Sequence, residues 1–219
     1  MTTASIPPAD AGAWAPLRQP IFRALWLAIL GSNIGTWIND VAASWVMAEQ
    51  TGSPLMVAAV QSATTLPVVL FALAAGTLAD IVDRRRYLML TQGWMLLVAA
   101  SLSLLSHLQL LTPWVLVALT FAMGMGAAMA MPAQAAIVSE LVPRPLLASA
   151  VALNSIGMNI ARSIGPAIGG LIVAQFGPPW AFLLNGLTFG LMMWVLWRWR
   201  RETQAVSYTH LRAHETRGN

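Results

Sequence analysis

The sequence predicts an all-α membrane protein with six transmembrane helices, and three observations support this fold class. Apolar residues make up 58% of the 219 residues and charged residues only 9%, whereas a soluble domain is typically about a quarter charged. The apolar residues gather in six stretches, each close to or above the roughly 20 residues that a helix needs to cross a bilayer. No segment alternates between apolar and polar residues, which argues against a transmembrane β-barrel.

The first three spans are defined by the residues that interrupt them. The span at residues 22–48 ends ahead of the Gly-Ser-Pro turn at Pro54. The span at residues 54–79 ends at a cluster of charged residues, which hydrocarbon excludes. The span at residues 87–106 ends at a polar break that runs to Pro113.

The last three spans are bounded in the same way. The span at residues 113–139 ends ahead of a Pro-Arg-Pro sequence, and the span at residues 146–174 ends ahead of Gly177-Pro-Pro. The span at residues 180–197 is near the lower length limit and ends at arginines. Most connections are only a few residues long, so consecutive helices are expected to run antiparallel.

These boundaries divide the chain into three parts. Residues 1–20 form a polar segment ahead of the first span, residues 21–201 form the six-span bundle, and residues 202–219 form a polar tail without periodicity. The tail resembles translated read-through of a sequencing adapter, and a native cytoplasmic linker is the alternative. For this reason His210, His214 and Glu215 are left out of the functional interpretation.

Arginine placement predicts the orientation. The formal charge of +4 is carried on arginine, because the chain has no lysine. The connections at residues 49–53, 107–112 and 175–179 contain no lysine or arginine, so both ends and the other two connections are expected to face the cytoplasm. This alternation predicts a multi-pass protein of the bacterial inner membrane with a cytoplasmic N-terminus. The arginines that flank the spans on this side are Arg18, Arg23, Arg84, Arg85, Arg86, Arg144, Arg198, Arg200 and Arg201.

The connection between the second and third spans holds the densest charge. Two acids and three arginines within seven residues cannot lie in hydrocarbon, so they are expected to form a short aqueous loop. The glycine ahead of them is expected to remove a side chain where the second span approaches a neighbour. For the loop as a whole, the alternative to a conformational role is that its charges only set the membrane topology. The segment comprises Gly76, Asp80, Asp83, Arg84, Arg85 and Arg86.

Polar residues inside the spans are the second group of candidates, because burying them in a membrane is costly. Asp40 shares one face of the first span with Asn33, and Arg162 shares one face of the fifth span with Asn159. Counting from the ends of the spans places Asp40 and Arg162 within about one turn of the same height. We expect these residues to couple proton and substrate, and a purely structural role for Asp40 is the alternative.

Small residues in the fifth span form a third group. Gly165 and Gly169 stand four residues apart, a spacing that permits close helix packing, and Gly170 follows directly. Pro166 frees a carbonyl group and permits a bend. The interpretation as a specific helix–helix interface and that of generic small-residue packing both remain open.

Enzyme and nucleic-acid functions are not expected. The chain has no cysteine and no lysine, which excludes thiolate metal sites and the lysine of an ATP-binding P-loop. His107 lies in an outer connection without an acidic partner nearby in the sequence. The arginines stand at the ends of apolar stretches rather than on one solvated face, which argues against nucleic-acid binding. No cofactor and no metal are expected.

Together these motifs resemble the major facilitator superfamily, and within it the bacterial exporters of the enterobactin-exporter and macrolide-efflux types. The resemblance is carried by the loop from Gly76 to Arg86 and by the Arg-Ser-Ile-Gly-Pro-Ala-Ile-Gly-Gly sequence that ends at Gly170. It covers about residues 17–201. One departure is Asp83, where the wider superfamily usually has glycine. The larger departure is length, because the family has twelve spans and this chain has six.

The resemblance implies a fold and a function. The chain would be the amino-terminal half of a twelve-helix transporter, built of two inverted three-helix repeats, and the charged loop would latch the inner gate. The intact protein would export a small amphipathic molecule, such as a siderophore or drug, driven by protons. Its partners would be the lipid bilayer, a C-terminal six-helix half and the substrate. A six-span membrane scaffold or assembly protein is the alternative.

Overall fold

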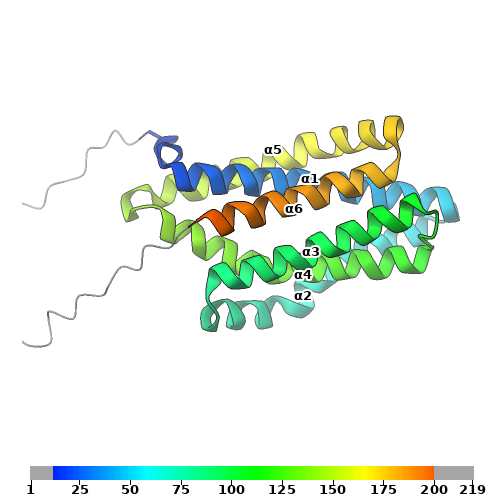
Figure 1. The fold of residues 1–219 in the computed structure, drawn as a ribbon, viewed down its shortest axis with the longest axis horizontal. Helices are drawn as coiled ribbons and strands as arrows, with labels where there is room; N and C mark the ends of the chain where they lie inside the picture. Colours follow the sequence, from blue (N-terminus) through cyan, green and yellow to red (C-terminus); the bar gives the residue numbers. More distant parts are fainter. Residues whose placement is uncertain (1–11, 200–219) are drawn as a thin grey trace, which may run out of the picture.

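The structure is a computed structural model that describes residues 12–199, within which six long α-helices account for most of the chain. The helices lie side by side along one axis (Figure 1). Each predicted span coincides with one long helix, which confirms the fold class and the number of spans. The elements are η1 (Ala15–Arg18), α1 (Pro20–Thr51), α2 (Pro54–Ile81), α3 (Arg84–His107), α4 (Pro113–Leu141), η2 (Arg144–Leu146), α5 (Leu147–Phe176) and α6 (Pro178–Arg198).

The interpretation of the tail at residues 202–219 lies outside the described residues, as do Arg200, Arg201 and most of the segment at residues 1–20.

Local chemistry sets the helix boundaries. Four of the six helices begin at a proline, whose fixed backbone angle suits the first helical position and whose missing N–H group costs nothing there. Helix α1 is capped at its C-terminal end by Gly52, which follows Thr51 and adopts a left-handed conformation with φ of 58°. At 32 residues α1 is about 48 Å long, more than the roughly 30 Å of a bilayer core, so it must tilt or reach beyond the hydrocarbon.

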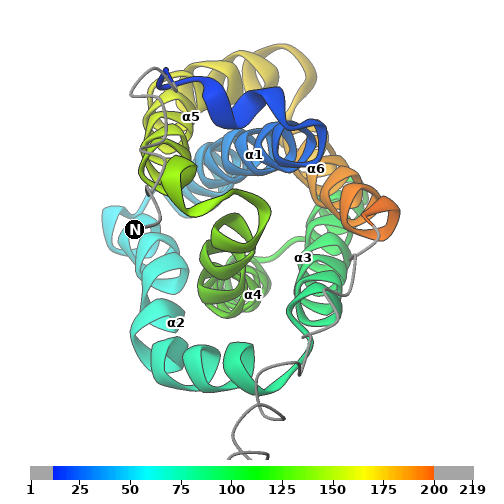
Figure 2. The ribbon, with the colours of Figure 1, turned by 90° about the vertical axis from the view of Figure 1, so that its left-hand side faces the viewer.

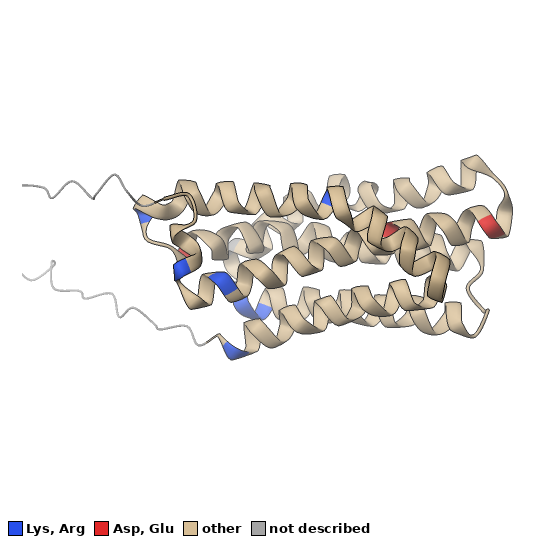
Figure 3. Ribbon diagram, turned by 90° about the horizontal axis from the view of Figure 1, so that it is seen from above, with Lys and Arg blue, Asp and Glu red and all other residues tan. Residues whose placement is uncertain are grey.

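The two ends of the bundle differ in charge. Both ends of the described chain lie at the same end of the bundle (Figure 1), and basic residues gather toward that end (Figure 3). We call it the arginine-bearing end. The opposite end carries the three connections without lysine or arginine, which join α1 to α2, α3 to α4 and α5 to α6.

The packing repeats within the bundle. Seen from the arginine-bearing end, α1 lies between α5 and α6, and α4 lies between α2 and α3 (Figure 2). The two arrangements are equivalent: α1 corresponds to α4, α2 to α5 and α3 to α6, and each central helix packs against the second and third helices of the other unit. Helix α1 starts at the arginine-bearing end and α4 starts at the opposite end. The bundle therefore consists of two three-helix units that run in opposite directions.

Helices α1 and α5 approach each other closely because glycines line the contact. A Cβ atom built on Gly165 would lie 2.5 Å from the Cβ of Trp37, and one on Gly169 would lie 3.0 Å from the Cα of Ile38. These two glycines pack directly against α1, whereas a Cβ on Gly170 would meet nothing within 4 Å. A Cβ on Gly76 would also meet nothing within 4 Å, so the expected close approach of the second span at that glycine is not made to a described helix of this bundle and stays a prediction.

Candidate functional site

An open groove of about 450 Å³ contains the acid of the first span. It lies where α1, α2 and α5 meet, and Asp40 lies in its wall with Trp37 of α1 and Pro166 of α5. Successive turns of α1 bring Trp37, Asp40 and Ser44 to this wall, as their helical spacing predicts. Among the described residues, Asp40 is the one charged residue in the lining. We call this space the Asp40 groove.

A hydrogen bond joins two walls of the Asp40 groove. Gln61 of α2 donates from Nε2 to the hydroxyl oxygen of Ser44 at 3.1 Å, and both residues line the groove. Trp45 lies in the same lining and is largely exposed. The groove therefore combines a carboxylate, an amide, a hydroxyl group and two indole rings, a set that suits an amphipathic molecule better than a purely apolar one.

Arg162 occupies a different level of the bundle. It is exposed and donates from its guanidinium to Oδ1 of Asn159 at 2.6 Å, and the Asn159 amide donates to the carbonyl oxygen of Ser155 at 2.9 Å. Helices α1 and α5 run parallel to each other, and the contact of Gly165 on α5 with Trp37 on α1 fixes their register. This register places Arg162 at about the height of the turn of α1 that contains Asn33.

The expectation that Asp40 and Arg162 lie within about one turn of the same height is therefore wrong. Asp40 lies seven residues beyond Asn33, which is about 10 Å further along α1. Counting from the ends of the spans missed the stagger between the two helices. Asn33, Asn159 and Arg162 form one polar level, and the Asp40 groove forms a second level nearer the opposite end of the bundle.

The charged connection is shorter than the sequence predicts. Only Val82 and Asp83 lie between α2 and α3, because the arginines already form the first turn of α3. Asp83 caps that turn by accepting a hydrogen bond from the backbone N–H of Arg86 at 2.9 Å. Aspartate is among the best residues at such a position, which gives a physical reason for Asp83 where glycine is usual. Asp80 lies in the last turn of α2, and its side chain is not among those that the structure describes.

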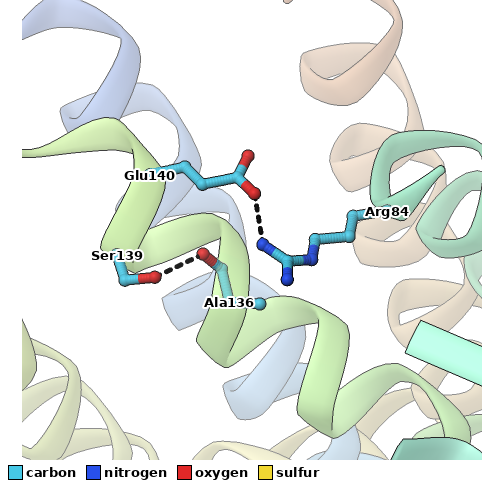
Figure 4. A network of polar contacts seen from close by, with 4 residues as sticks. All are labelled: Arg84, Ala136, Ser139 and Glu140. Carbon is cyan, nitrogen blue, oxygen red and sulfur yellow. Dashed lines mark hydrogen bonds and ion pairs between the residues drawn. The ribbon is translucent and has the colours of Figure 1, made fainter. Parts of the chain in front are cut away.

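Two arginines of α3 bind the ends of neighbouring helices. Arg84 pairs with Glu140 in the last turn of α4, and Ser139 beside it donates to the carbonyl oxygen of Ala136 (Figure 4). Arg85 donates from Nε to the carbonyl oxygen of Leu196, and from a terminal nitrogen to that of Trp197, both at 2.7 Å. The last carbonyl groups of a helix lack partners within it and attract a cation.

These contacts make the connection a clamp, which we define as Asp83, Arg84, Arg85, Glu140 and the last turn of α6. The sequence analysis did not identify Glu140 as a site residue. An acid at the arginine-bearing end of an apolar span could have indicated it as a partner for an arginine. The contact of Arg85 with α6 depends on backbone carbonyl groups. No residue type could have revealed it.

A polar cavity at the opposite end brings together residues that are distant in the sequence. Glu49 and His107 both line this cavity of about 420 Å³, so His107 does have an acidic residue in its surroundings. The amide of Gln50 donates to the carbonyl oxygen of Leu111 at 2.7 Å and ties α1 to the connection after α3. Within residues 12–199, no three His, Asp or Glu side chains come together as metal ligands would.

Comparison with known proteins agrees with this architecture. Residues 11–214 match the family described as transmembrane secretion effectors. The chain is 29% identical to the staphyloferrin A transporter of Staphylococcus aureus over 157 residues, which cover 71% of this chain and 40% of that protein. It is 28% identical to the multidrug efflux pump Tap of Mycobacterium tuberculosis over 186 residues, or 80% of this chain and 42% of the pump.

A third relative is an uncharacterised transporter of the major facilitator type from Bacillus subtilis, which is 28% identical over 187 residues. That match covers 82% of this chain and 44% of the relative. The chain thus spans about two fifths of the length of the curated relatives it matches. Its six helices and its match over residues 11–214 place it in the transmembrane secretion effector family of the major facilitator superfamily.

Proposed function

We propose that this chain is one half of a proton-driven transporter that exports a small amphipathic molecule. The observation that carries the proposal is the Asp40 groove, where a carboxylate within a membrane-spanning helix lines an open space. An acid inside a span is costly and is a functional candidate by default, because it can change its charge when a proton binds. The names of the relatives, a staphyloferrin A transporter and a multidrug efflux pump, support transport, and the second of them supports export.

The groove favours substrates with an aromatic or cationic part. Trp37 and Trp45 offer ring faces, and Asp40 offers a negative charge beside them. Arg162, with Asn159 and Asn33 about two turns away, offers an opposite charge and amide groups at the second polar level. A substrate or proton would then pass between the two levels, rather than being shared by an Asp40–Arg162 ion pair.

The helices that a second half would cover are the least buried ones. In the most apolar 18-residue window of each helix, 17% of residues are buried in α2 and 28% in α5, against 39% in α3, α4 and α6. Helices α2 and α5 occupy equivalent positions in the two three-helix units. Alternating access by rocking of two six-helix halves is documented for facilitators. A second six-helix half packed on α2 and α5 is therefore part of the proposal.

The clamp is proposed to set the conformation of the arginine-bearing end. It contains Asp83, Arg84 and Arg85, which are three of the six residues of the predicted gating loop. It ties α3 to the ends of α4 and α6 through charge-assisted hydrogen bonds, the stronger kind. Breaking it would loosen three helix ends together.

A transport experiment tests the proposed function. Bacteria that lack their main efflux pumps and produce the intact transporter containing this chain should accumulate less of a fluorescent amphipathic cation than cells without it. Adding a protonophore should abolish that difference. Equal accumulation with and without the transporter, across amphipathic cations and siderophores, would support the scaffold alternative.

The proposed orientation gives a labelling prediction. The chain contains no cysteine, so single cysteines can be introduced without a background. A cysteine at Ser53, in the connection between α1 and α2, should react with a membrane-impermeant thiol reagent added to intact cells. A cysteine at Arg86, an exposed residue at the arginine-bearing end, should react only after the cells are opened. The reverse pattern would mean that the N-terminus faces outward.

The clamp gives a charge-swap prediction. Arg84→Glu or Glu140→Arg places like charges together and should lower transport about twofold to fivefold, in line with the energy of a partly exposed ion pair. The double variant, which exchanges the two charges, should recover most of the loss. Arg144→Glu, an exposed change at the same end, serves as the control. A double variant no better than the worse single variant would show that the pair does not act as a unit.

A further inference from the structure

A crevice at the arginine-bearing end has no part in the proposed transport path. It has a volume of about 380 Å³ and lies between the start of α1 and the ends of α4 and α6. Its walls are almost entirely apolar, with Ile21, Ala24 and Leu25 on α1, Leu141 on α4 and Val195 on α6. We call it the α1–α6 crevice.

The α1–α6 crevice carries one positive charge. Arg198, in the last turn of α6, lines it and lies over the ring of Trp194, with 5.5 Å between its guanidinium carbon and the ring centre. None of the described residues that line the crevice is acidic. Within residues 12–199, no acidic side chain pairs with Arg198. A guanidinium stacked on an indole ring keeps its N–H donors at its edge, where they can bind a phosphate oxygen.

The side chains around the crevice suit the level where a membrane meets water. Tryptophan is enriched at that level, and both Trp194 and Trp199 line the crevice. Ile21 is 48% exposed and Trp194 is 50% exposed, so the crevice opens to the surroundings between α1 and α6. In a membrane, these exposed apolar side chains face lipid. Arg198 lies at the end of α6, where the apolar walls give way to the charged region.

The size of the crevice suits part of a hydrocarbon chain. If each methylene group takes about the 30 Å³ that a water molecule occupies in the liquid, 380 Å³ holds roughly a dozen of them. An apolar cavity of this volume with a cation at its mouth matches an acyl chain joined to an anionic headgroup. A soluble anion such as free phosphate would leave the apolar walls without a partner.

We propose that the α1–α6 crevice binds an anionic phospholipid from the leaflet at the arginine-bearing end. An acyl chain packs against Ala24, Leu25 and Leu141, and the phosphate accepts hydrogen bonds from Arg198. The site is distinct from the Asp40 groove and shares no lining residue with it. It gives α1 and α6, which also pack against each other, a common lipid partner.

Native mass spectrometry of the purified intact transporter that contains this chain tests the site. The protein is incubated with equal amounts of phosphatidylglycerol and phosphatidylcholine that carry the same acyl chains, and the lipids that stay bound are counted. The wild type should retain phosphatidylglycerol in preference. Arg198→Gln should lower this preference about fivefold, the effect of one basic residue near an anionic surface. Ala24→Phe, which fills the crevice, should lower retention of both lipids.

Two controls decide the outcome. Arg144→Gln removes an exposed arginine at the same end outside the crevice and should retain the wild-type preference. Arg198→Lys keeps the charge and should retain more than half of the preference, which separates loss of headgroup binding from misfolding. Equal retention of both lipids by the wild type would overturn the proposal. So would an Arg144→Gln effect as large as that of Arg198→Gln, or unchanged binding in Ala24→Phe.

Discussion

Replacing Asp40 by asparagine is expected to abolish proton-driven efflux while the protein still inserts in the membrane. Asparagine keeps the size and one acceptor oxygen of the side chain but can neither carry the negative charge nor exchange a proton. Because Asp40 is the one charged residue among the described residues that line its groove, none of these neighbours can take over either role. Efflux of a fluorescent cation from intact cells should fall at least tenfold, to the level of cells without the transporter.

Glu49→Gln provides the matched control for this experiment. It removes an acid from the same helix, but Glu49 lies in the polar cavity at the far end of α1 rather than in the Asp40 groove. Efflux by this variant should stay within about twofold of wild type, and both variants should reach the membrane in equal amounts on immunoblots. Undiminished efflux by Asp40→Asn would leave Asp40 as a structural residue, and the proposed coupling role would have to be abandoned.

Adding a single methyl group at Gly165 is expected to destabilise the bundle strongly. The Cβ atom of an alanine there would lie 2.5 Å from the Cβ of Trp37, closer than two such atoms can approach. Helices α1 and α5 must then separate or shift, and overpacking of this kind typically costs about 1–3 kcal/mol. For a chain of this size we expect the midpoint of thermal unfolding in detergent to fall by roughly 5 °C or more.

Gly170→Ala makes the same chemical change on the same helix without the contact. No atom lies within 4 Å of the Cβ position at Gly170, and alanine has the higher helix propensity. This variant should melt at or slightly above the wild-type temperature in the same thermal unfolding measurement in detergent. If both alanine variants lowered the midpoint equally, the loss would reflect glycine content in α5 rather than the contact with Trp37.

The number and order of the helices followed from hydropathy because each span must satisfy its backbone hydrogen bonds internally. The connection between α2 and α3 did not follow, since charge excludes residues from hydrocarbon without ending a helix. Arg84 is too polar for the membrane core and yet stands in the first turn of α3, capped by Asp83. Hydropathy located the membrane boundary there, and capping chemistry located the helix boundary three residues away.

The face of α1 that lines the Asp40 groove could be predicted from the sequence, but the height of Asp40 relative to Arg162 could not. The helical face of Asp40 is visible in the spacing along α1, and the structure places Trp37, Asp40 and Ser44 together in one wall. The vertical offset of Arg162 is not visible, because it depends on which turn of α5 meets which turn of α1. That register is fixed by glycine contacts between helices more than a hundred residues apart.

The opposed direction of the two three-helix units has a consequence for how such a chain can arise and diverge. A unit with an odd number of spans has its ends on opposite sides of the membrane, so a second copy joined in tandem is necessarily inverted. Contacts in the interior can then be inherited unchanged by both copies, as the matching packing of α1 and α4 indicates. The connecting segments cannot be inherited in this way. Corresponding turns of the two copies emerge in different compartments, so each must acquire its own complement of arginines after duplication.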